Sequence, residues 1–405
     1  MPRFCAFKLP AWTLIDGDLP LSNVSITRAL STPKALDADL DRRYAHLLDA
    51  DGDSLIREWG TAIVAEHAGV LDVFIVDGAV TEGDQENLGI TAGGVAGFGA
   101  DQPWLPANTA VRSALSAMHA AVGTHRLATG TEAGGIGWNA STGEIAGVEV
   151  DPLDIVRAIW LMLTTAPRSD LRLTIDDTVS DARIGEEERD VEFTTAAGED
   201  VAFQAGPHRL TWHGTHDMGK EIDDLAEETP FEWWEESQWD GDLPSTRLRL
   251  AYPSKPITRK TNLFFEIGTN VVSVSAANWT EHADVVLVVG QGEGSARVRA
   301  HVADPSDRLR RVHVAADRGV ASKTRANEVA RKELDRLKSV PHITEITVTD
   351  HPAARFGTFD IGDVITVRGE AGWVMLDHDY RIVAITHDFE AETQSLTLEV
   401  VDGAT

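Results

Sequence analysis

A glycine-rich segment offers the first pattern that could bind a ligand. Residues 288–295 read Val-Val-Gly-Gln-Gly-Glu-Gly-Ser, so Gly290, Gly292 and Gly294 follow an apolar run. In dinucleotide-binding proteins such glycines open a helix whose N-terminus holds the pyrophosphate. Residues 296–302 instead alternate like a strand, so no helix dipole would face the phosphates. We therefore predict a structural turn at the three glycines and no bound cofactor, with dinucleotide binding as the alternative.

Histidines and a carboxylate suggest a second possible site. His208, His213, His216 and Asp217 lie close together in the sequence, and both residue types can ligate zinc. The segment has no strong helical register that would bring the rings together, and its spacing matches no known metal template. Exposed histidines in a loop or at a strand edge are the simpler interpretation. We predict no metal site.

Carboxylates and indole rings are interleaved between Glu232 and Asp242. Paired carboxylates beside aromatic rings are how glycosidases work. The competing interpretation is an acidic solvated face with Trp side chains packed inward, ending in an Asp-Gly turn. Proximity in sequence does not establish the separation that glycoside chemistry needs, so we predict no catalytic role for Glu235, Glu236 or Asp240. The sequence has no Gly-x-Ser-x-Gly elbow, Walker loop or His-Glu-x-x-His helix.

The charge of the chain limits its partners. Its 405 residues include 65 Asp and Glu against 36 Lys and Arg, a formal net charge of −29. Such a chain is soluble and should not grip DNA by neutralising phosphates. No apolar stretch is long enough to cross a bilayer, and residues 1–5 do not begin a signal peptide. Cys5 is the only cysteine, which excludes an intrachain disulfide.

Three regions with different patterns must position these residues. Residues 1–100 are β-rich, with a buried strand at 70–78 and a glycine-rich loop at 92–99. Residues 101–252 mix helices and strands. Residues 253–405 return to strands, which we expect at 284–289, 297–302, 343–348, 363–367, 380–385 and 396–401.

Three segments have helical periodicity. Residues 108–122 place apolar side chains on one side. Asp151 and Pro152 are typical of an N-cap and a first helical position, and the following helix is apolar nearly all round until Ala166 precedes Pro167. Residues 321–338 form an amphipathic helix. The second of these helices should therefore be buried.

The carboxy-terminal third carries a resemblance to a known family. Residues 285–294 (Val-Val-Leu-Val-Val-Gly-Gln-Gly-Glu-Gly) precede Arg297, a strand and a helix containing 330–334 (Ala-Arg-Lys-Glu-Leu). Residues 362–367 (Gly-Asp-Val-Ile-Thr-Val) and a later strand at 380–385 follow. This order resembles the tail-hub family of long-tailed phages, also labelled baseplate hub or minor tail protein. Softer matches at 151–157, 173–176 and 232–241 extend the resemblance over roughly residues 71–401.

The resemblance implies a mainly β fold with inserted α/β elements, of the α+β class. Two tube-forming β-barrel-like domains would be accompanied by peripheral insert domains. We expect an N-terminal hub domain at 1–100, an insert region at 101–252 and a C-terminal hub domain at 253–405 that contains the helix at 321–338. The family also implies a homotrimer, whose two tube domains per chain match a sixfold tail tube.

The function implied is structural and non-enzymatic. The chain would be the hub at the tip of a long non-contractile virus tail, joining the tube to the tip and forming a conduit for genome ejection. Its partners would be a distal tail protein or tail tube ring, a tape-measure protein and a tail-tip fibre or spike, while DNA passes through without specific binding. It would be assembled in the host cytoplasm. The alternatives are a tail-tip cell-wall or polysaccharide hydrolase and a receptor-binding module.

Overall fold

The fold is built mainly from β-strands. The computed structural model describes residues 2–45, 47–48, 52, 54–80, 87–103, 126–129, 135–139, 144–147, 151–180, 182, 189–194, 200–205, 209–211, 217–275, 283–292, 294, 297–304, 309–316, 320, 322–338, 343–372 and 374–401. Strands make up 50% of it and helices 16%, which confirms the expected mainly β, α+β class. The helix expected at 108–122 lies outside the described residues.

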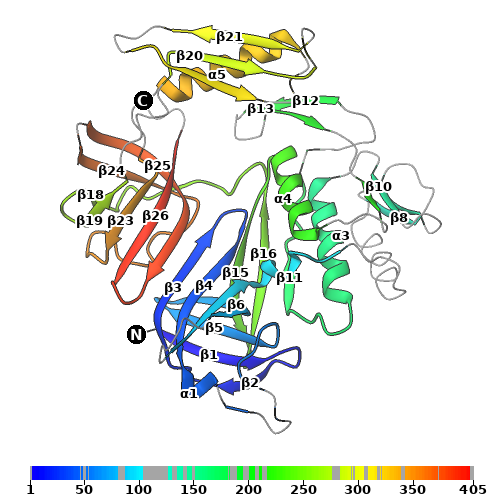
Figure 1. Cartoon of the computed structure of the whole chain (residues 1–405), viewed down its shortest axis with the longest axis vertical. Helices are drawn as coiled ribbons and strands as arrows, with labels where there is room; N and C mark the ends of the chain where they lie inside the picture. The colour runs from blue at the N-terminus through cyan, green and yellow to red at the C-terminus, as the bar shows by residue number, and fades with distance from the viewer. Residues whose placement is uncertain are drawn as a thin grey trace.

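Seven antiparallel strands form an N-terminal β unit, at the bottom of Figure 1. They pair in the order β2–β1–β5–β6–β7–β4–β3. Their bounds are β1 (Arg3–Lys8), β2 (Thr13–Asp16), β3 (Leu21–Ala29), β4 (Thr32–Asp41), β5 (Thr61–His67), β6 (Val70–Val80) and β7 (Asn87–Gly94), with α1 (Arg42–Ala45) after β4. Side chains 71–76 of β6 are all buried, as the apolar run predicts.

The expected loop at 92–99 is wrong. Its first three residues, Ala92 to Gly94, end β7, and the rest form the 3₁₀ helix η1 (Val95–Gly99). Strand β7 is hydrogen-bonded to β4 on one side and to β6 on the other, so two distant neighbours override the local glycine signal.

A second β unit is built from the C-terminal part of the chain. It contains β17 (Thr258–Arg259), β18 (Phe265–Glu266), β19 (Val271–Val274), β23 (Glu345–Thr349), β24 (Asp363–Ala371), β25 (Val374–Asp388) and β26 (Thr393–Val400). Strand β25 also pairs with β3, from Ala384 opposite Ala29 to Asp388 opposite Ser25, which joins the two units edge to edge. Among the described residues no closed barrel is formed.

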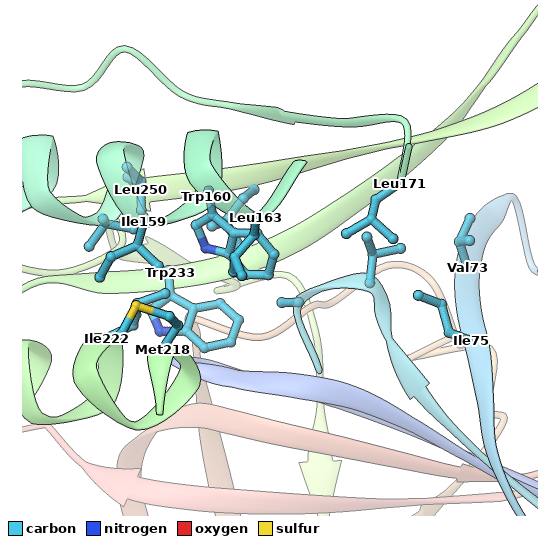
Figure 2. Packing of buried hydrophobic residues seen from close by; sticks show 14 of the residues in the cluster. Val73, Ile75, Ile159, Trp160, Leu163, Leu171, Met218, Ile222, Trp233 and Leu250 are labelled. Atoms are coloured by element: carbon cyan, nitrogen blue, oxygen red, sulfur yellow. The ribbon is translucent and has the colours of Figure 1, made fainter. Parts of the chain in front are cut away.

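A third group of elements covers the N-terminal unit. The hairpin of β15 (Glu232–Asp240) and β16 (Leu243–Ala251) takes up β11 (Leu173–Ile175) in parallel, and Ser237 pairs with Leu71 of β6. Helices α3 (Pro152–Thr165) and α4 (Met218–Glu228) add Trp160 and Met218 to the core shared with β5, β6 and the hairpin (Figure 2). This core is the largest in the described chain.

Smaller sheets lie at the periphery (Figure 1). One contains β8 (Arg126–Thr129), β9 (Gly135–Asn139), β10 (Glu144–Gly147) and β14 (Arg209–Thr211), and another contains β12 (Arg189–Thr194) and β13 (Asp200–Ala205). The third has the order β21–β20–β22, with β20 (Val285–Val289), β21 (Arg299–Ala303), β22 (Val312–Ala316) and the helix α5 (Lys323–Lys338). The amphipathic helix expected at 321–338 is thereby confirmed.

None of the described helices is both long and apolar enough to span a membrane. Helix α3 is apolar because it is a core helix: eleven of its residues are buried, including the ion pair of Arg157 with Asp154. Its N-cap is Asp151, as expected, and Pro152 starts the first turn.

Asp151 should contribute more to the free energy of unfolding than an ordinary N-cap does. It is fully buried, and its carboxylate accepts hydrogen bonds from the backbone of Leu153 (2.9 Å), the backbone of Ser180 (2.8 Å) and the Ser180 hydroxyl (2.8 Å). Replacing Asp151 with Ala should lower the free energy of unfolding by about 2–3 kcal/mol, measured in urea. The half-buried cap Asp217 of α4 is the control, where Ala should cost only about 1 kcal/mol. Equal losses would contradict this ranking.

Candidate functional site

An open cleft of about 560 Å³ lies where the N-terminal unit, the β15–β16 hairpin and the loop at 357–361 meet. Its lining combines cations and carboxylates. Arg28 and Lys34 come from β3 and β4, and Arg247 and Arg249 come from β16. Asp72, Glu235, Glu236 and Asp360 also line the cleft. The cleft is therefore mixed in charge although the chain as a whole is acidic.

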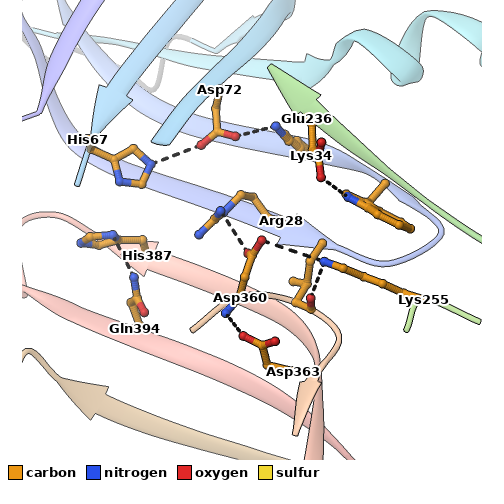
Figure 3. A network of polar contacts seen from close by, with 12 residues as sticks. Arg28, Lys34, His67, Asp72, Glu236, Lys255, Asp360, Asp363, His387 and Gln394 are labelled. Atoms are coloured by element: carbon orange, nitrogen blue, oxygen red, sulfur yellow. Dashed lines mark hydrogen bonds and ion pairs between the residues drawn. The ribbon is translucent and has the colours of Figure 1, made fainter. Parts of the chain in front are cut away.

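A buried ion pair lies at the floor of this cleft (Figure 3). The Lys34 ammonium contacts one oxygen of Asp72 at 2.5 Å, and Nε2 of His67 contacts the other at 3.2 Å. Burial alone would raise the pKa of Asp72, but the Lys34 charge and the His67 hydrogen bond outweigh it, so this pKa lies well below its usual range. The group is an ionised carboxylate held between Lys34 of β4 and His67 of β5.

Glu235 is the second buried carboxylate. It is 5% exposed and accepts hydrogen bonds from the backbone N–H groups of Val95 (2.9 Å) and Lys34 (3.3 Å). Burial raises the pKa of Glu235, while the Lys34 charge and these donors oppose the rise. A Cβ on Gly94 would lie 2.3 Å from Oε1 of Glu235, so only glycine allows this approach. Glu235 therefore attaches β15 to β4 and η1.

Three further contacts connect the hairpin and β3 to the C-terminal part of the chain. Glu232 accepts both hydrogen bonds of a bidentate contact from Arg381 of β25, each 2.6 Å long. Asp360 lies 3.2 Å from Arg28, and Lys255 stacks over the ring of Trp234 at 4.6 Å. Because bidentate Arg–carboxylate contacts are directional, they set the orientation of the two units as well as their proximity.

Histidines and aromatic rings pack beside the β3–β25 contact. The ring of His387 in β25 stacks on Phe389, with 4.0 Å between the ring centroids. The ring of His67 in β5 meets the His387 ring edge-on, at 5.4 Å between centroids. His387 is 9% exposed, and Nε2 of Gln394 donates to its Nδ1 at 3.3 Å. Burial lowers the pKa of His387 to about 4, helped by His67 and Arg28 and opposed by Asp388. The ring is neutral at ordinary pH.

This arrangement is suited to holding elements together. His67 resembles the base of a relay because it contacts a carboxylate, yet its Nδ1 has no hydrogen-bond partner among the described residues. No hydroxyl or thiol of the described residues is hydrogen-bonded to that nitrogen, as activation by a base would need. Glu235 and Glu236 are consecutive on a strand, where successive side chains leave opposite faces, and the Glu235 carboxylate is already engaged by the backbone of Lys34 and Val95. The pair therefore differs from the two free carboxylates that flank a sugar in glycosidases.

The residues singled out from the sequence are distributed over several places. Trp233 and Trp234 are buried as expected for inward-packed rings, but Trp239 is 37% exposed and Glu235 is buried, so the solvated acidic face is wrong for Glu235. Asp240 contacts Arg172 at 2.9 Å. The described residues contain no cluster of metal-ligating side chains. His208, His213 and His216 lie outside them, and Asp217 caps α4.

The glycine segment connects β20 to β21, which are antiparallel neighbours. Gly290 and Val298 are hydrogen-bonded at its base (2.8 Å). Gly292 has φ +103° and Gly294 has φ +57°, and a Cβ on Gly290 would lie 2.3 Å from the carbonyl oxygen of Val320. Positive φ at Gly292 and Gly294 favours glycine in a turn, and the close approach of the Val320 carbonyl leaves no room for a side chain at Gly290. A structural role for the three glycines stays a prediction.

Sequence reasoning missed Lys34, His67 and Asp72. One signal was present: Asp72 interrupts the apolar run of β6, and a charge inside a buried strand requires a partner. Nothing in the sequence identifies that partner, because Lys34 lies 38 positions from Asp72. The contact between Lys34 and Glu235 joins residues that are 201 positions apart.

Comparison with known proteins gives fold similarity without close sequence relatives. No family model and no curated protein matches the chain. A 43 kDa tail protein of prophage MuSo2 from Shewanella oneidensis matches with a TM-score of 0.53 and 14% identity, over 98% of this chain and 97% of that one. The chain shares its fold with this prophage tail protein.

Two weaker structural similarities were found. A tail protein from Neisseria meningitidis MC58 gives a TM-score of 0.49 at 11% identity, with 99% and 97% of the two chains covered. The prophage tail protein gp18 from Listeria monocytogenes EGD-e gives 0.44 at 11% identity, with 99% and 95% covered. At these identities the comparisons concern the fold, and function has to be argued separately.

His387 should make the protein acid-sensitive. Above pH 6.5 the ring is neutral in both the folded and the unfolded chain. As pH falls towards 4 the unfolded chain takes up a proton that the folded chain resists, so stability is lost, by at most about 3 kcal/mol. We expect the free energy of unfolding in urea to fall between pH 6.5 and 4. Replacing His387 with Phe should flatten this part of the profile, and an unchanged slope would contradict the assignment.

The effect of substituting each glycine in the turn should depend on its backbone conformation and on the space around it. Gly290→Ala places a methyl group against the Val320 carbonyl, and Gly292→Val forces a β-branched residue to positive φ, so both should lower the yield of folded protein and its Tm. Gly294→Asn is the control, because Asn tolerates φ near +57° and the site is open. Saturable NAD or ATP binding that is lost in Gly292→Val would overturn the structural assignment.

Proposed function

We propose that this chain is a structural, non-enzymatic protein of a virus tail, the hub at the tip of a long non-contractile tail. It would join the tail tube to the tip and form a conduit for genome ejection. The observation that carries this proposal is the fold shared with a prophage tail protein over nearly the whole length of both chains. The resemblance of residues 285–294, 330–334 and 362–367 to tail hubs supports it independently.

The arrangement of the sheets supports the assignment to a hub. Two mainly antiparallel β units are joined edge to edge through β3 and β25, while the smaller sheets and helices lie around them. If three copies close a ring, six such units face a sixfold tube. Regions 1–100, 101–252 and 253–405 then act as tube domain, insert and tube domain. A distal tail protein or tube ring, a tape-measure protein and a fibre or spike would be the neighbours.

The charge supports a conduit. DNA carries one negative charge per roughly 1.7 Å of its axis, so a basic wall would hold it through many phosphate contacts. A chain of net charge −29 allows a neutral or acidic lumen, along which DNA slides without specific binding. Repulsion reaches only about 8 Å at physiological salt, so the residues that act on the DNA must lie near the lumen.

A reconstruction of the tail tip tests this function. We expect three copies in a ring at the tip, a lumen without clustered Arg and Lys, and particles that lack a functional tip when the gene is deleted. One or six copies, or a particle without the chain, would refute the hub. Sugar or peptide released from host envelopes by the purified chain, and lost in Glu235→Gln, would instead support the hydrolase. Binding of the isolated chain to host cells would favour the receptor-binding module.

A further inference from the structure

The small unit at 284–338 has two different faces. Helix α5 covers one of them, where Val286, Val288, Ala300, Ala330 and Leu334 form a separate core cluster. His313 of β22 contacts Glu333 of α5 at 3.5 Å on the same side. Since side chains alternate along a strand, the neighbours of these residues project away from the helix.

The opposite face is an apolar stripe with a basic edge. Register places Leu287 between His301 and Val314, and Val289 between Arg299 and Ala316. Val312 and Val314 are 49% and 56% exposed, and Arg299 and His301 are exposed as well. We call this surface the open sheet face, made of the residues Leu287, Val289, Arg299, His301, Val312 and Val314.

The location of the open sheet face fits an intermolecular contact. The unit lies at one end of the molecule, away from the N-terminal β unit (Figure 1). Leu309, just before β22, is 91% exposed, and its neighbours Arg310 and Arg311 are exposed too. Contiguous exposed apolar side chains rimmed by charge mark interaction surfaces more often than isolated ones do.

Charge identifies the kind of partner. Residues 284–338 contain 12 Lys and Arg against 8 Asp and Glu. The rest of the chain holds the other 24 of 36 basic residues and the other 57 of 65 acidic residues. A basic unit on an otherwise acidic chain is complementary to another copy of the same chain, and such complementarity both steers encounter and sets register.

We propose that the open sheet face docks on the acidic body of a second copy of this chain. Two different surfaces meet, so the contact is heterologous, and it closes a ring when the rotation between copies permits. The inference rests on the proposed function, because this contact would be an interface between the subunits of the proposed homotrimer. A face of three short strands covers less than the roughly 800 Å² per partner of a standard interface, so assembly of the isolated chain should depend on concentration.

Sedimentation velocity of the purified full chain over a range of concentrations tests the proposal. Val314→Asp should raise the dissociation constant of the oligomer at least about tenfold, because the new carboxylate would be buried unpaired. Arg299→Glu is an exposed second variant that changes charge alone, and it should also weaken assembly and reduce its dependence on salt. Val272→Asp is the matched control, because Val272 is 58% exposed on β19 in the C-terminal unit. Circular dichroism checks that each variant is folded.

Each result decides the matter. Loss of assembly in Val314→Asp and Arg299→Glu, with assembly retained in Val272→Asp, supports the interface. An oligomer that persists in both of the first two variants overturns it while leaving the trimeric hub intact. Equal loss in the control overturns it too, since added negative charge would then be the cause. A wild-type chain that stays monomeric at its highest soluble concentration removes the interface, and the tail-tip reconstruction then judges the hub separately.

Discussion

The carboxylate of Asp72 lies inside the N-terminal β unit with no exposure to solvent, and the rest of the arrangement depends on neutralising it there. An unpaired charge at such a depth costs several kcal/mol. Lys34 and His67 supply the compensation from β4 and β5. The backbone N–H of the same Lys34, with that of Val95, then satisfies the second buried carboxylate, Glu235. Lys34 thus stabilises both buried carboxylates, Asp72 through its side chain and Glu235 through its backbone N–H.

The consequence extends to the assembly of the molecule. Glu235 places β15 over the N-terminal unit, and three residues earlier Glu232 makes its bidentate contact with Arg381 of the C-terminal unit. One strand therefore carries both attachments. Together with the β3–β25 ladder, they hold the two β units in a fixed orientation. Buried ion pairs add little net stability on average, and their value here is directional.

The peripheral unit at 284–338 differs from the rest of the chain in its core and in its charge. Its core is small and aliphatic, its helix covers one side only, and its charge is opposite in sign to that of the remaining chain. The large shared core is built around Trp160 and Trp233 and is covered by α3 and α4. Val312 and Val314 leave apolar surface exposed on the small unit, and burying that surface against a partner would lower the free energy.

The sequence by itself determined the elements whose signals act within one or two turns or along one strand. Asp151 and Pro152 start α3, the apolar stripe at 321–338 forms α5, and the segment 70–78 forms a strand whose side chains 71–76 are buried. Cap geometry and side-chain periodicity are local, so a single segment contains the whole signal. The resemblance of residues 285–294 to tail hubs predicted the mainly β, α+β class, and the structure confirms it.

Only the tertiary structure decided where the charges lie. Glu235 looked like part of a solvated acidic face, but donors far away in the chain bury it. The glycine-rich segment 92–99 looked like a loop, but Ala92 to Gly94 end β7, because β4 and β6 pair with that strand on its two sides. The depth of Asp72 and the exposure of Val314 follow from which segments cover which faces. Burial, pairing and docking surfaces depend on contacts between distant segments, and local sequence does not contain that information.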